Sequence, residues 1–389
     1  MSRAYWQLWT SSGLSNLADG ILKVALPLVA VQFTRSPPLV AGLAVAVTLP
    51  WLVCALPAGA LVDRLDRRRA MLAANLTRAA LLAAVTAAVL LGWGSIWLLY
   101  GAAFLIGTAE TVYDTAAQSI VPQIVPRERL TQANGRLFAA ELTANQFVGP
   151  PLAGLLAAAA AALAFATPAA LWLLAVAALF LVRGSYRVDR TEPTTTLRAD
   201  IAAGLRYLWR QKVLRRLAVL TGLFNFASNA ATAVLVLYAT GPMRLPEAGY
   251  GLLLGTIAAG SLVGSLAGAW LERRLGRTRT LVLALPAGAV LIGVPAATTS
   301  PYLVGAGFFV GGIGIVVANV VMVSLRQRIT PDAMLGRVNS CYRLIAWGTM
   351  PLGALVGGLL AQQIGLRPLF AVMAVVALTG LTCVRALDT

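Results

Sequence analysis

The chain has 389 residues, of which 59% are hydrophobic and 12% are charged, and its formal net charge is +17. Soluble domains have roughly 45–50% apolar and about 25% charged residues, so this composition excludes an ordinary water-soluble fold. The sequence contains no histidine, and neither of its lysines, Lys23 and Lys212, follows a glycine. Histidine chemistry and a phosphate-binding GxxxxGK[ST] loop are therefore excluded, and we expect no enzymatic activity, no metal and no cofactor.

Long runs rich in Ala, Leu and Val dominate the sequence and lack the alternation of a barrel strand, which favours helices. A spanning helix needs about 20 residues. In chain order the predicted helices cover residues 7–34, 39–62, 70–91, 96–118, 133–160, 166–183, 214–240, 249–271, 280–297, 302–325, 338–362 and 367–385. The sequence thus predicts an all-α membrane protein with twelve transmembrane helices in two pseudo-symmetric six-helix bundles.

The most polar stretch lies between the sixth and seventh predicted helices. It contains RTEPTTTLRAD, which is typical of a linker, and the following IAAGLRYLWRQKVLRR is basic and amphipathic, as in helices that lie on a membrane surface. We therefore predict an N-terminal bundle over 1–183, a cytoplasmic linker with an amphipathic helix over 184–213, and a C-terminal bundle over 214–389.

The distribution of Arg and Lys predicts the orientation in the membrane. With the N-terminus in the cytoplasm, 25 of these 31 residues fall on the inside and only three, Arg35, Arg244 and Arg367, on the outside. Such an excess is the positive-inside pattern of a multi-pass protein of the cell membrane. Both termini are then cytoplasmic, and the basic side chains face lipid head groups, so no nucleic-acid partner is needed to explain the charge.

The two halves repeat a short motif. GALVDRLDRRR (59–69) ends the second helix, and GAWLERRLGRTR (268–279) ends the eighth; in both, a glycine precedes an acid by four residues and a basic cluster follows. Parallel repeats of this kind are typical of proteins built from symmetric halves around a central cavity.

GALVDRLDRRR closely resembles the loop 2–3 signature of the major facilitator superfamily. The matching residues are Gly59, Leu61, Asp63, Arg64, Arg67 and Arg68, whereas Asp66 replaces a second glycine. The stretches SNLADGILKVALPLVA and ANGRLFAAELTANQFVGP are similar to the enterobactin-exporter and macrolide-efflux branch. The resemblance covers essentially the whole chain and implies the major facilitator fold.

The resemblance also implies a conformational latch at this loop. Asp63 would face the N-terminus of helix 11, where a carboxylate is favoured, and the arginines would bind nearby acids. The implied latch consists of Gly59, Asp63, Arg64, Arg67, Arg68 and Asp114. The alternative is a basic cluster that only sets the orientation.

Helix 5 carries a second family pattern. GPPLAG (149–154) resembles an antiporter signature in which Gly149, Pro150 and Gly154 match and Asn145 stands in place of a glycine. This favours efflux. The alternative is a purely structural role, because proline kinks a helix and glycine permits close packing.

Charged residues within predicted helices are candidates for coupling and binding, because a charge in the bilayer requires a partner or a wet cavity. Asp19 and Lys23 are one turn apart on helix 1. Asp19 either takes up a proton or a cation, or forms an ion pair with Lys23.

Arg78 and Glu110 lie equally far from the turn that joins helices 3 and 4, so we expect them at the same depth, where they can form a salt bridge. The alternative for Arg78 is snorkelling to the inner head groups. Glu141 and Asn145 share a face of helix 5, and Glu141 is a second candidate proton carrier or a partner of Arg136.

Asn225 and Asn229 share a face of helix 7 and complete the candidate substrate residues. The leading prediction is a monomeric secondary transporter that exports lipophilic or cationic small molecules, such as drugs, in exchange for protons. Two alternatives are export of a siderophore or another endogenous metabolite, and a membrane sensor that does not transport.

Overall fold

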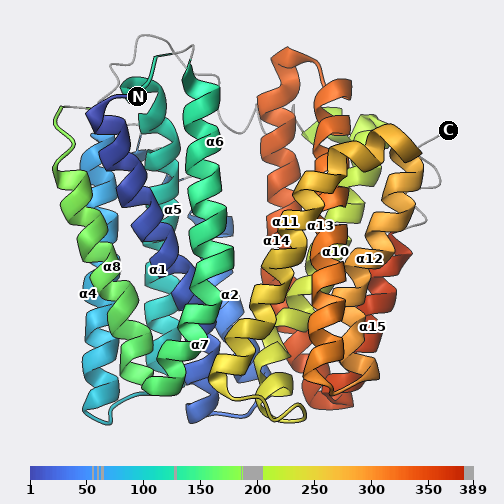
Figure 1. Cartoon of the computed structure of the whole chain (residues 1–389), viewed down its shortest axis with the longest axis horizontal. Helices are drawn as coiled ribbons and strands as arrows, with labels where there is room; N and C mark the ends of the chain where they lie inside the picture. Colours follow the sequence, from blue (N-terminus) through green and yellow to red (C-terminus); the bar gives the residue numbers. More distant parts are fainter. Residues whose placement is uncertain are drawn as a thin grey trace. The chain divides into compact units, whose positions relative to one another are not determined.

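The computed structural model describes residues 1–54, 57–58, 61–62, 65–126, 129–184, 186 and 205–380. Within these ranges, the side chains of residues 131, 327, 332–337, 339, 340 and 343 fall outside the description. Every regular element in the described part of the chain is helical (Figure 1). The residues cluster into two compact units.

Unit 1 comprises Met1–Arg35, Ala46–Arg190 and Leu245–Gly255. Its helices are α1 (Arg3–Phe33), the second half of α2 (Pro37–Val53), α4 (Arg67–Leu90), α5 (Ile96–Ile124), α6 (Leu130–Glu141), the π-helical segment η2 (Leu142–Val148), α7 (Gly149–Ala159) and α8 (Ala161–Phe180). Helix α1 packs against α8 and against α6, η2 and α7, while α4 packs against α5 and α8. Helix α1 therefore lies between α8 and the consecutive helices α6, η2 and α7.

Local signals define where these helices begin. The Ser2 hydroxyl accepts a hydrogen bond from the Tyr5 amide at the start of α1, and Ser95 caps α5 in the same way. Asp66 caps α4 by accepting from the Arg69 amide at 3.0 Å. Such caps satisfy amide groups that have no partner within the helix.

Unit 2 comprises Ser36–Val45, Thr191–Arg244 and Thr256–Thr389. Its helices are α10 (Lys212–Thr240), most of α11 (Glu247–Leu275), α12 (Arg277–Ala297), α13 (Pro301–Ile329), α14 (Asp332–Ile364) and α15 (Leu366–Thr379). Glycines bring helix backbones together here. A Cβ on Gly260 of α11 would lie 1.9 Å from the Phe309 carbonyl oxygen of α13, and one on Gly353 of α14 would lie 2.2 Å from that of Phe226 of α10. Close approach at small residues is the usual packing mode in a bilayer.

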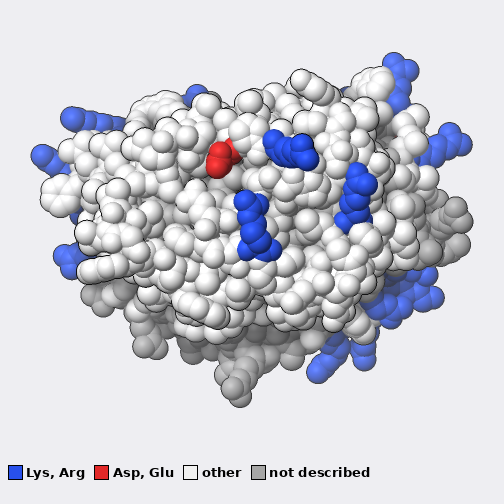
Figure 2. Space-filling view, turned by 90° about the horizontal axis from the view of Figure 1, so that it is seen from below, with Lys and Arg blue, Asp and Glu red and all other residues white. Residues whose placement is uncertain are grey.

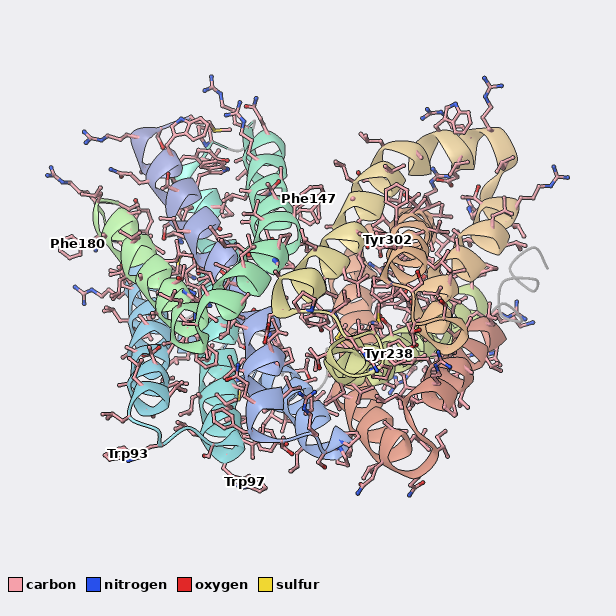
Figure 3. The ribbon with its side chains drawn as sticks, turned by 60° about the horizontal axis from the view of Figure 1, so that its bottom comes forward. Trp93, Trp97, Phe147, Phe180, Tyr238 and Tyr302 are labelled. Atoms are coloured by element: carbon pink, nitrogen blue, oxygen red, sulfur yellow. The ribbon has the colours of Figure 1, made fainter. Side chains whose placement is uncertain are left out.

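Each of the twelve predicted segments overlaps a described helix or a run of consecutive helices, and parts of the predicted 39–62 and 367–385 lie outside the described residues. Nine of the described helices are long and apolar enough to span a bilayer, and α2 and α15 are shorter apolar helices. Exposed aromatic side chains mark helix ends: Trp93 and Trp97, 75% and 67% exposed, project where α4 turns into α5 (Figure 3). Tryptophan at this position is typical of the membrane–water interface.

One predicted element is divided. The sequence predicts a single helix over 133–160, whereas the structure has α6, then the wider π-helical turns of η2, then α7. A π-helical segment adds a residue to the turn and often marks a functional site. The side chain of Phe147 projects from η2 (Figure 3).

Candidate functional site

A fully buried arginine lies at the centre of unit 1. Arg78, near the middle of α4, has no exposed surface, and Asp19, near the middle of α1, is 7% exposed. The Arg78 Nη2 atom donates to Asp19 Oδ1 at 3.1 Å and to Ser15 Oγ at 2.9 Å. The two opposite charges neutralise each other within the apolar interior, as buried charges require.

Aromatic rings enclose the guanidinium group. The ring of Trp172 on α8 lies 4.6 Å from Arg78 Cζ, and the ring of Tyr113 on α5 lies 5.2 Å from it. Both distances are those of cation–π contacts, which are stronger when water is excluded. Four helices, α1, α4, α5 and α8, therefore hold this one cation.

The hydrogen bonding of this cluster is incomplete. The Nε and Nη1 atoms of Arg78 are buried and have no hydrogen-bond partner among the described residues, and the same is true of Asn75 Nδ2. The Ser15 hydroxyl donates to Asn75 Oδ1 at 3.3 Å. Unsatisfied buried donors are rare in native proteins, and the donors of Arg78 are free to bind a second acceptor.

The partner of Arg78 differs from the prediction. We expected Glu110 at the same depth, but the structure pairs Arg78 with Asp19. Among the described salt bridges there is none between Asp19 and Lys23. The exposed Lys23 amine instead donates to Asn145 Oδ1 at 3.1 Å. Distance along a helical hairpin gives the depth of a side chain but not its direction around the helix axis, and α4 directs Arg78 towards α1 and α8.

Glu110 and Asp19 line the same small cavity. The cavity, of about 20 Å³, is lined by Asp19, Lys23 and Glu110 together with apolar side chains of α1, α2 and α5. That volume holds about one water molecule. Three of the predicted charged residues therefore share one compartment.

The other two acids of the unit lie within electrostatic range of this compartment. Asp114 interacts with Glu110, Asp19 and Arg78, and Glu141 interacts with Lys23 and Glu110. The sequence assigns Asp114 to the latch, and that role stays a prediction because Gly59, Asp63 and Arg64 lie outside the described residues. The acids Asp19, Glu110, Asp114 and Glu141 thus form one interacting set, which we call the acid cluster.

The glycines of the antiporter-like pattern lie at close helix crossings, first of all where α1 crosses the η2–α7 segment. A Cβ on Gly20 of α1 would lie 2.5 Å from the Asn145 carbonyl oxygen, and one on Gly149 would lie 2.7 Å from the Gly20 carbonyl carbon. Gly154 approaches α11 in the same way, 2.6 Å from the Glu247 carbonyl oxygen. Pro150 follows Gly149 in the first turn of α7. These residues therefore have packing roles, whatever else they do.

The implied latch is described only in part. Gly59, Asp63 and Arg64 lie outside the described residues. Arg68 donates from Nη2 to the Phe180 carbonyl oxygen at 2.8 Å, and Arg67 donates from Nη1 to that of Tyr186 at 3.1 Å. The described partners of both arginines are carbonyl oxygens at and after the end of α8, where a cation is favoured, rather than the expected acids.

Asp66, the departure from the family pattern, connects the same two segments. Besides capping α4, its carboxylate accepts from the Tyr186 amide at 2.6 Å. The sequence signal was present, because an acid one residue before a helix is a common N-cap.

In unit 2 one of the two predicted asparagines links helices, and the other bonds within its own helix. Asn225 Nδ2 on α10 donates to the Ala346 carbonyl oxygen of α14 at 2.8 Å, and Asn229 Nδ2 donates to the Asn225 carbonyl oxygen at 3.0 Å. Tyr342, nearby in unit 2, forms a hydrogen bond with Thr221 through its hydroxyl, and Arg326 lies over its ring at 4.0 Å.

Comparison with known proteins places these features in a family. The model of a family described as transmembrane secretion effector matches residues 1–387. The multidrug efflux pump Tap of Mycobacterium tuberculosis is 29% identical, with 94% of this chain and 89% of the relative covered. Macrolide efflux protein A of Streptococcus pyogenes is 23% identical, with 94% and 91% covered.

Solved structures agree on the fold. A bacterial homologue of the iron transporter ferroportin in its inward-facing state superposes with a TM-score of 0.76 at 19% identity, covering 99% of each chain. A variant of the nucleoside transporter NupG gives 0.78 at 12% identity, covering 100% of each. The chain belongs to the transmembrane secretion effector family, within the major facilitator superfamily of membrane transporters.

Proposed function

We propose that this protein is a proton-coupled exporter of lipophilic or cationic small molecules, that it acts by alternating access, and that it works as a monomer. The observation that carries the proposal is the Arg78–Asp19 ion pair, enclosed at the centre of the membrane helices beside Glu110. The relatives that are named as multidrug and macrolide efflux pumps support the direction of transport and the class of cargo.

The ion pair supplies a physical route for coupling. When a proton neutralises Asp19, Arg78 becomes a lone cation in the bilayer interior, which costs at least about 2.5–3.5 kcal/mol. Every ~1.4 kcal/mol is a tenfold change in an equilibrium, so protonation shifts the balance between two conformations by about 100-fold. Arg78 has further donors, and Glu110, which interacts electrostatically with Asp19, is the acid placed to receive them.

In the proposed orientation, the protein lies in the cell membrane and both of its termini are in the cytoplasm. In unit 1 basic residues gather at the start of α4, and in unit 2 they gather around the α11–α12 turn. In the view of Figure 2 the Lys and Arg side chains are scattered singly. The two predicted bundles, 1–183 and 214–389, are the bodies proposed to move.

Transport by reconstituted vesicles tests the role of the ion pair. We expect uphill uptake of a labelled macrolide, driven by an imposed proton gradient, to be lost in Asp19→Asn and in the double variant Asp19→Asn/Arg78→Gln, because no proton can then exchange at this site. Exchange of labelled for unlabelled macrolide without a gradient should persist in the double variant, which shows that it is folded and binds cargo.

Glu247→Gln is the matched control, because it neutralises an acid in the first turn of α11. It should retain gradient-driven uptake. Uptake by the double variant at the wild-type rate would eliminate the ion pair as the coupling site.

A further inference from the structure

A groove of about 800 Å³ runs along the opposite face of α1 from the ion pair. It is lined on α1 by Trp6, Trp9, Thr10, Gly13, Leu14 and Leu17, and on α6 and η2 by Arg136, Ala139, Ala140, Thr143, Ala144 and Val148. Its volume is in the range of sites for small molecules, roughly 300–1,000 Å³. Nothing in the proposed transport mechanism uses it.

The groove is separate from the acid cluster. At 3.6 residues per turn, the groove-lining residues of α1 point about 170° away from Ser11, Ser15 and Asp19. No acid lines the groove, and α5, which carries Glu110 and Asp114, does not contribute to its walls. The groove is therefore an apolar channel on the outside of the polar core.

The length of the groove matches one leaflet of a bilayer. From Arg136 to Val148 the helix rises about 18 Å, and from Trp6 to Leu17 about 16 Å, at 1.5 Å per residue. Half of a hydrocarbon core of about 30 Å is about 15 Å. A ligand that fills the groove thus extends from the head-group level to the middle of the membrane.

The end of the groove at the start of α1 carries a cation beside an aromatic ring. The Arg136 guanidinium lies 5.3 Å from the ring of Trp6, which is 45% exposed, and the Trp9 indole donates to the Arg136 carbonyl oxygen at 3.1 Å. In the part of the chain that the structure describes, no carboxylate forms an ion pair with Arg136. An arginine fork matches a phosphate group, and tryptophan suits the head-group level.

We propose that this groove binds one anionic phospholipid, with an acyl chain along the apolar walls and the phosphate at Arg136. The apolar lining accounts for the chain, its single cation accounts for the negative head group, and its length accounts for a lipid of one leaflet. A soluble anion would leave the apolar walls exposed, and a lipophilic cation would meet Arg136.

Native mass spectrometry of the full chain from mixed micelles of equal phosphatidylglycerol and phosphatidylcholine tests the proposal. We expect one phosphatidylglycerol retained in preference to phosphatidylcholine. Arg136→Gln should reduce this preference about fivefold, the equivalent of ~1 kcal/mol for one basic residue near an anionic surface. Ala140→Trp, which fills the groove, should abolish retention of both lipids.

Arg279→Gln is the matched control, because it removes one exposed charge at the start of α12. It should leave the preference unchanged. Equal retention of the two lipids, an equal loss in Arg279→Gln, or full retention in Ala140→Trp would overturn the proposal. So would stoichiometric displacement of the lipid by a macrolide, which would assign the groove to cargo. The measurement needs no gradient, so it stands whether or not the transport proposal does.

Discussion

At the residue scale, the central feature is a single arginine that four helices enclose. Arg78 is neutralised by Asp19 and sandwiched by Trp172 and Tyr113. The pair contributes little net stability, because desolvation of two charges offsets their attraction, but removal of one partner leaves the other charge buried. An ion pair within membrane helices is by default a candidate functional site.

A double-mutant cycle in detergent tests this energetic coupling. We expect Asp19→Asn and Arg78→Gln each to lower the free energy of unfolding by about 3–5 kcal/mol, whereas the double variant should recover most of the loss because no unpaired charge remains. Thermal unfolding followed by the loss of helical signal measures all four proteins. Arg279→Gln, at an exposed position at the start of α12, is the control and should change little. Purely additive effects of the two single substitutions would contradict the coupling.

At the element scale, the predicted fifth helix, which the structure divides into α6, η2 and α7, crosses α1 with almost no side chain between the two backbones. Gly20 and Gly149 place the two backbones in contact, and the crossing lies where η2 meets α7. Lys23 spans the same junction through its bond to Asn145. A movement of η2 is therefore transmitted directly to the helix that carries Asp19, without an intervening flexible side chain.

A pair of glycine substitutions on α1 tests this crossing. Gly20→Ala adds a methyl group 2.5 Å from a backbone oxygen, so we expect destabilisation of about 1–3 kcal/mol and impaired transport. Gly13→Ala on the same helix meets nothing within 4 Å and should be neutral or stabilising by about 0.5–1 kcal/mol. The apparent unfolding temperature of the two variants distinguishes them, and equal values would contradict the crossing.

At the scale of the whole molecule, the two units differ in how they use charge. Unit 1 buries an ion pair midway along its helices, whereas the ion pairs described in unit 2 are at helix ends, where Glu272 lies 3.9 Å from Arg277 and 4.0 Å from Arg328. The described interior polar contacts of unit 2 are hydrogen bonds of neutral side chains, such as that from Asn225 to the Ala346 carbonyl oxygen. This asymmetry assigns the proposed proton chemistry to unit 1, although the sequence motifs repeat in both halves.

Labelling of single cysteines tests the proposed orientation. In a variant without the native cysteines, Trp93→Cys at the α4–α5 turn should react with an impermeant maleimide in intact cells, because 75% of that side chain is exposed at a predicted outer end. Arg273→Cys, in the last turn of α11, should react only after the membrane is permeabilised. The reverse pattern would invert the topology.

Much of the fold was predictable, because membrane helices can be recognised from the length and composition of their apolar runs. The twelve predicted segments overlap the described helices, and most of their boundaries within the described residues differ by a few residues. The partner of Arg78 was predicted wrongly, because that choice depends on the rotation and tilt of α4 against α1 and α8. The common depth of Arg78 and Glu110 and the latch role of Asp114 stay predictions.

The sequence by itself determined that this protein resides in a lipid bilayer, how many helices it is predicted to have and to which family it belongs, since each follows from the order of apolar residues or from a short motif. The tertiary structure alone decided which charges form ion pairs and where the predicted fifth helix widens into η2. It also decided which face of α1 is polar and which lines a groove. These depend on contacts between residues far apart in the chain, and a buried charge selects among such contacts by the cost of remaining unpaired.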